Sequence, residues 1–118
     1  AMAKLVIENL GYPSALTGKP VALLGVAAGR IGAIKSIEQL RGIAGHVGAL
    51  VVPGSVSIAN VTAAFDATGQ VTDVGTAEAL RGLARALDTF MTNYVCPKYV
   101  MEAAVRDGSL VPPWTTTV

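Results

Sequence analysis

The chain has one cysteine, no cluster of basic residues and no long apolar run, and each absence excludes a class of protein. A single thiol, Cys96, cannot form an internal disulfide, which favours a cytoplasmic setting over an oxidising one. The net charge is only +1, and no patch interleaves lysine and arginine with aromatic residues, so no nucleic-acid surface is indicated. The apolar runs are much shorter than the ~20 residues that span a bilayer, and no signal-peptide pattern opens the chain, so no membrane contact is expected.

What remains is the composition of a folded domain. The 118 residues are 52% hydrophobic and 14% charged, which allows a buried core and excludes the highly charged composition of disordered chains. No repeat, low-complexity tract or linker divides the sequence, so a single domain is expected over residues 1–118. No pattern suggests a Ser/His/Asp triad or a metal-ligand cluster.

Local patterns in the first half predict alternating helices and strands. Ala1–Leu10 is predicted as a short helix that stops before Gly11 and Pro13. Lys19–Val26, "KPVALLGV", is a continuous apolar strand. Because it does not alternate, burial on both faces is expected, as in a parallel sheet covered by helices.

The next segments complete a strand–helix–strand unit. Ala27–Gly32 is predicted as a turn, Ala33–Val47 as an amphipathic helix ended by Gly48, and Ala49–Pro53 as a second buried strand. Two parallel strands joined by a helix make a right-handed crossover, so the fold class predicted is α/β.

The second half is predicted to be mostly helical. Gly54–Asn60 is expected to be a loop, and Phe65–Asp73 an excursion outside the sheet. Thr72 or Thr76 is expected to cap a helix that runs to about Tyr94. A last helix, Pro97–Arg106, is followed by an extended tail, in which Trp114 is expected to pack onto the domain or a neighbour.

The turn Ala27–Gly32 is the candidate site. Ligands of open α/β sheets bind at the carboxyl ends of the strands, where the following helix also points its first amides. The glycines Gly25, Gly29 and Gly32 do not have the spacing of a dinucleotide fingerprint, and no phosphate-loop motif occurs. The pattern alone therefore leaves two interpretations open, a ligand-binding turn and a plain tight connection.

A longer stretch carries a family resemblance. Residues 18–61, "GKPVALLGVAAGRIGAIKSIEQLRGIAGHVGALVVPGSVSIANV", resemble the second half of the NADPH-dependent FMN reductase family of flavodoxin-like flavoproteins. The similarity lies in the strand "GKPVALLG", the glycine turn, "LRGIAGHVGA" and "VVP". "KLVIENLG" also resembles the family's helix after its flavin loop, and "FDATGQVTD" a later family segment. The resemblance runs from Lys4 to Leu87.

The resemblance implies a partial flavodoxin-like, doubly wound fold that retains the fourth and fifth strands with flanking helices. The family's serine-rich phosphate loop has no counterpart in the sequence, so a truncated domain is expected, with residues 1–94 family-like and 95–118 a C-terminal helix and tail. The implied cofactors are FMN and NAD(P)H, and the turn would contact the isoalloxazine ring. The implied contacts are Ala28, Gly29, Arg30, Ile31 and Gly32.

Two functions from different classes follow. The first is an NAD(P)H-dependent FMN reductase-like module, inactive alone and binding FMN weakly or not at all, which a complementing N-terminal half or self-assembly would complete. The second is a non-catalytic, oligomeric flavodoxin-like fragment that acts by association or binds nothing.

In flavodoxin-like order the strand Val21–Val26 would be interior, so losing its neighbour leaves an open apolar edge. A homodimer or larger oligomer is therefore expected.

Three single residues, Arg30, His46 and Cys96, are considered as functional groups. Arg30 fits either a contact to flavin or to a nucleotide phosphate, or a solvated or interface arginine. His46, near a helix C-terminus, is expected to be a favourable partner of the helix dipole. Cys96 has no neighbouring cysteines and is expected to be inert.

Overall fold

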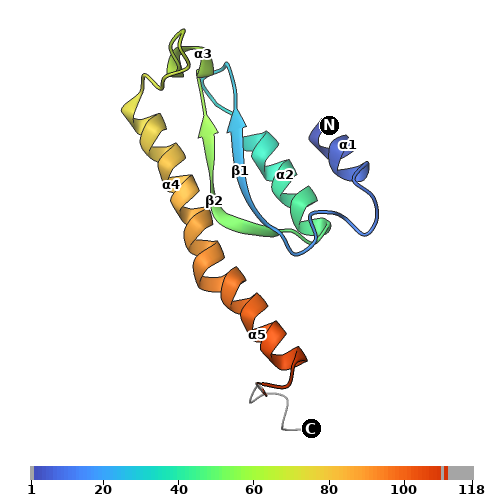
Figure 1. Ribbon diagram of the computed structural model, residues 1–118. Coiled ribbons are helices and arrows are strands. Elements are labelled where there is room, and N and C mark those ends of the chain that lie inside the picture. Colours follow the sequence, from blue (N-terminus) through green and yellow to red (C-terminus); the bar gives the residue numbers. More distant parts are fainter. Residues whose placement is uncertain (1, 110, 112–118) are drawn as a thin grey trace.

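The computed structural model describes residues 2–109 and 111, and shows a parallel two-stranded sheet between helices (Figure 1). Helix α2 packs on one face of both strands, and α4 packs on the other face, mainly against β2. The α/β class, in a form consistent with part of a flavodoxin-like fold, is thereby confirmed. The elements are α1 (Met2–Glu8), β1 (Pro20–Val26), α2 (Ile34–His46), β2 (Leu50–Ile58), α3 (Val61–Ala64), α4 (Val74–Phe90), a π-helical turn η1 (Met91–Val95) and α5 (Cys96–Arg106).

Strand β2 is longer than the sequence predicted. It runs to Ile58, so the prediction of a loop over residues 54–60 was wrong for most of that segment. Between the β1 residues Val21 and Leu23 the register shifts, because β2 places extra residues at Pro53 and Gly54. Pro53 has no N–H for the ladder and Gly54 has φ +83°, so a bulge accommodates both and pairing resumes at Ser55.

The core lies mainly between α2 and the sheet. Gly25 of β1 allows this close approach, because a Cβ at that position would lie 2.7 Å from the Cβ of Ala33. The expectation that β1 is buried on both faces was wrong: Leu24 and Val26 remain 47% and 56% exposed. Their face of β1 is only partly covered by α4. The buried apolar side chains are Leu23, Ala33, Ile37, Ala44, Val52, Ile58, Ala64 and Val95.

Helix α4 begins at a cap that the sequence analysis missed. Asp73, rather than Thr72 or Thr76, is the N-cap, and its Oδ2 accepts the Thr76 N–H at 2.9 Å. The same oxygen accepts the Thr76 hydroxyl at 2.8 Å. Thr76 lies inside the first turn, where its amide needs a partner, so it is the capped residue and not the cap.

The predicted break between Tyr94 and Pro97 does not occur. Helix α4 continues through η1 into α5, and α5 extends beyond the end of the sheet (Figure 1). Pro97 is the second residue of α5, in the first turn after the π-helical segment, where the regular i to i−4 hydrogen bonding is already interrupted, so the helix tolerates it. Trp114 lies outside the described residues.

Helix α1 and the segment between α3 and α4 lie outside the sheet and its two covering helices. Helix α1 contacts α2, and Asp66 closes the 66–70 turn by accepting the amides of Thr68 and Gln70 at 2.8 and 2.9 Å. Phe65 and Val71 form an isolated antiparallel bridge, so this segment does lie outside the sheet, as predicted. None of the helices in the described part of the chain combines the length and apolar character that a membrane span requires.

Candidate functional site

The turn of residues 27–32 lies at the carboxyl end of β1, beside the junction of β2 and α3. Three backbone hydrogen bonds hold it there. The Ala27 N–H donates to the Ile58 carbonyl at 2.9 Å, and the Ala27 carbonyl accepts the Val61 N–H at 3.0 Å. The Gly29 carbonyl accepts the Asn60 N–H at 3.1 Å. The ends of two parallel strands thus fix the position of the turn.

The end of the turn is held by a side chain. The Ser57 hydroxyl oxygen accepts the Ala33 N–H at 2.7 Å, which satisfies an amide at the start of α2. Gly32, at φ +80°, brings the backbone close to this hydroxyl, because a Cβ there would lie 2.6 Å from the Ser57 Oγ. Neither Ser57 nor Asn60 is predicted as a site residue from the sequence, because both lie in the segment expected to be a loop.

The five predicted contact residues are adjacent in the turn, and most of their surface is open. Ala28, Gly29, Arg30 and Ile31 are exposed, with Ile31 84% exposed. The amides of residues 28–32 donate no hydrogen bond to any residue that the structure describes. The turn therefore presents peptide edges and apolar surface together, which suits a flat ligand that has carbonyl or ring-nitrogen acceptors.

Charge at the turn comes from one side chain and from the backbone. Arg30 is the charged residue of the turn, and within the described residues its guanidinium forms no ion pair. The first amides of α2 add a partial positive charge on the same side. Within residues 2–109 and 111, no His, Cys, Asp and Glu side chains cluster as metal ligands. The site can orient an acceptor-bearing ligand.

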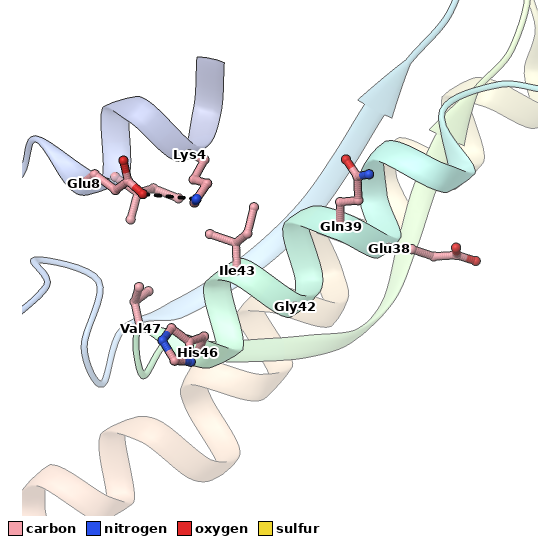
Figure 2. A pocket seen from close by; sticks show the side chains of 9 residues that line it. Lys4, Glu8, Glu38, Gln39, Gly42, Ile43, His46 and Val47 are labelled. Atoms are coloured by element: carbon pink, nitrogen blue, oxygen red, sulfur yellow. Dashed lines mark ion pairs between the residues drawn. The ribbon is translucent and has the colours of Figure 1, made fainter. Parts of the chain in front are cut away.

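The cavities between helices lie away from this turn. The largest described is a groove of about 760 Å³ between α1 and α2, where the Lys4 Nζ and Glu8 Oε1 pair at 3.3 Å along one wall (Figure 2). His46 lines that groove from the last turn of α2. A positive charge at this position would interact favourably with the helix dipole. Three smaller cavities of about 520, 440 and 220 Å³ are also lined by residues outside 27–32. None of these four cavities is lined by the turn.

Comparison with known protein families matches residues 1–63 to the family described as NADPH-dependent FMN reductase. The match covers just over half of the 118 residues, and it contains α1, β1, the turn, α2 and β2. It lies in the N-terminal part of this chain, so residues 64–87 of the similarity described above are outside it. Comparison with curated proteins finds no match.

Proposed function

Because the chain belongs to the NADPH-dependent FMN reductase family, we propose that it is an NAD(P)H-dependent FMN reductase-like flavoprotein module. The turn of residues 27–32 contacts the isoalloxazine ring of FMN. The observation that carries this proposal is the run of amides, residues 28–32, that have no partner among the described residues at the carboxyl end of a parallel strand. Ligands of open α/β sheets bind at this position, and the ring has acceptors for such amides.

The described residues orient and tune the ring, and the cofactor supplies the redox chemistry. FMN, when bound, accepts a hydride from NAD(P)H and passes electrons onward. The amides of the turn donate hydrogen bonds to the ring edge, and Arg30 favours negative charge on the reduced ring. Gly29 leaves space for the ring to approach the backbone of the turn, since no atom would lie within 4 Å of a Cβ at this position.

We further propose that β1 and β2 correspond to the fourth and fifth strands of the family's domain. The FMN phosphate is then held outside the described residues, by a complementing half or by another chain. The phosphate dianion normally forms the strongest, charge-assisted contacts of such a ligand. The described residues alone should therefore bind flavin weakly, and activity requires the completed site.

Two flavins separate ring contacts from phosphate contacts. Titration of the protein with FMN and with riboflavin, followed by flavin fluorescence, should give affinities that agree within about threefold, because the ring is common to both. Replacing Gly29 by leucine should abolish binding of both flavins by filling the approach to the turn. Gly45→Leu, on α2 where a side chain also has open space, is the matched control and should bind normally.

The possible results have different meanings. An FMN affinity at least tenfold above that of riboflavin would place a phosphate site in this chain and overturn the proposal that the phosphate is held elsewhere. Binding of neither flavin, or unchanged binding by Gly29→Leu, would overturn the role of the turn. The second candidate, a non-catalytic role by association, would then be favoured, and the open edge of β1 supports it.

We also propose a cytoplasmic setting. The supporting observation is that Cys96 is a free, exposed thiol, which persists in a reducing compartment.

A further inference from the structure

One edge of β1 is paired and the other is open. Within the described residues, β1 pairs with β2 alone. The Lys19 carbonyl accepts the Leu50 N–H at 2.8 Å, and the Ala27 N–H donates to Ile58 at 2.9 Å, so these odd-numbered residues face β2. Because the direction of backbone groups alternates along a strand, the even-numbered residues 22, 24 and 26 direct their N–H and C=O groups to the open edge.

Pro20, the first residue of β1, has no N–H to offer this edge, but nothing in residues 21–26 blunts it. Residues 21–26 carry no charge, whereas exposed edge strands are usually protected by charged side chains, proline or a bulge in the edge strand. The register shift lies in β2, so the backbone of β1 stays regular. Leu24 and Val26, which share the face away from α2, are 47% and 56% exposed beside the edge. The edge thus combines unpaired backbone with uncovered apolar surface.

The accessible surface of the chain leaves room for an interface. It is 8353 Å², whereas a folded monomer of 12.0 kDa exposes about 6,000 Å². Counting the nine residues outside the description as fully extended accounts for at most ~1,400 Å² of the difference. Roughly 1,000 Å² of excess surface remains over the whole chain, part of it on α5, which extends beyond the end of the sheet. A stable dimer of standard size buries about 800 Å² per partner.

We propose that a second copy of this chain pairs with β1 across a two-fold axis, with the two β1 strands antiparallel. The axis passes beside Leu24, so that Leu24 faces its symmetry mate and Ala22 faces the partner's Val26. All three of these residues direct their backbone groups to the open edge, so each facing pair exchanges both N–H···O=C bonds. The result is a four-stranded sheet in which Leu24 and Val26 cover one another. No charge in residues 21–26 opposes self-pairing.

This inference does not depend on flavin binding, and its test is carried out without flavin. The second copy takes the edge of β1 that the third strand of a complementing half would occupy, so the two arrangements exclude one another at that edge. Sedimentation equilibrium at micromolar concentration should show a dimer. Leu24→Lys should shift the protein to monomer, because it places two like charges opposite each other at the axis. Val100→Lys is the matched control: Val100 is 70% exposed and belongs to α5, which extends beyond the end of the sheet, so this variant should remain dimeric.

A cross-link tests the geometry even where Leu24→Lys fails to fold. Residues that face each other in a hydrogen-bonded antiparallel pair have Cα atoms about 5.5 Å apart, within the range that a disulfide spans. Leu24→Cys in a Cys96→Ser background should therefore form a covalent dimer on mild oxidation, and Val100→Cys in the same background should not. A monodisperse wild-type monomer would overturn the proposal. So would a dimer that survives Leu24→Lys and gives no Leu24→Cys cross-link, including one that forms through α5.

Discussion

The Ala33 N–H donates a hydrogen bond of 2.7 Å to the hydroxyl oxygen of Ser57, 24 residues further along the chain. Ala33 is buried and stands directly before α2, and Ser57 lies in β2. The contact therefore joins the end of the turn to the neighbouring strand. Together with the Asn60 amide on the Gly29 carbonyl, it holds the turn in one position, which is the condition for its amides to act as a preorganised ligand surface.

Removal of the Ser57 hydroxyl should destabilise the fold. Ser57→Ala leaves the buried Ala33 amide without this partner, so the free energy of unfolding should fall by about 1–2 kcal/mol. Urea denaturation followed by circular dichroism measures the change. Ser55→Ala, at an exposed position of the same strand, is the control and should change stability by less than ~0.5 kcal/mol. Equal losses in the two variants would contradict a specific role for Ser57.

Two glycine substitutions should change the stability of the fold in opposite directions. Gly25→Ala would place a Cβ 2.7 Å from the Ala33 Cβ and 3.0 Å from the Ile37 Cγ1, so overpacking should cost roughly 1–3 kcal/mol. Gly42→Ala, in α2, meets open space and should stabilise the helix by up to about 1 kcal/mol. Thermal unfolding of both variants checks this, and a Gly25→Ala protein as stable as wild type would show that the helix can move away from the strand.

The Asp73 cap should make stability depend on pH. The hydrogen bonds from the Thr76 hydroxyl and amide lower the pKa of Asp73 below its ordinary value of 3.8. The folded state thus favours the carboxylate, and this stabilisation is present above pH 3.8 and is lost as the pH falls through the lower pKa of the folded protein.

Two variants at this position separate capping from charge. Asp73→Ala should lower the melting temperature at neutral pH and flatten the acid dependence of stability. Asp73→Asn retains a capping oxygen and should preserve most of the neutral-pH stability while also flattening the acid dependence. Thermal melts between neutral pH and pH 3 test this, and an Asp73→Ala protein with the acid dependence of wild type would refute the assignment.

Arg30 should affect ligand binding and not stability. It is exposed and forms no ion pair within the described residues, so Arg30→Ala should leave the free energy of unfolding within ~0.5 kcal/mol of wild type. In anaerobic titrations the variant should lose more affinity for reduced than for oxidised FMN, because only the reduced ring becomes anionic. Arg81→Ala, on α4, is the control. Equal losses for both redox states would argue against a role of the Arg30 charge.

Several elements follow from local sequence alone. The apolar run before residue 27 predicted β1, and the amphipathic pattern of residues 33–47 predicted α2. The glycine at position 48 predicted the end of that helix, and it has φ +90°. These features depend on interactions between near neighbours, namely side-chain periodicity and backbone conformational preference, so no knowledge of the fold was needed.

Other features were decided by partners distant in sequence. Pro53 and Gly54 ordinarily end a strand, yet β2 continues because pairing with β1 outweighs the local break. Pro97 similarly fails to begin a separate helix, because the preceding π-helical turn accommodates it.

The candidate site divides in the same way. The glycine turn itself was predictable, because its residues are contiguous and glycine is needed at the positive φ of Gly32. Ser57 and Asn60 were not, since nothing in their immediate sequence indicates a contact with the turn. Only the parallel pairing of β1 and β2 brings the two strand ends together, so that a hydroxyl and an amide from one segment hold the backbone of the other.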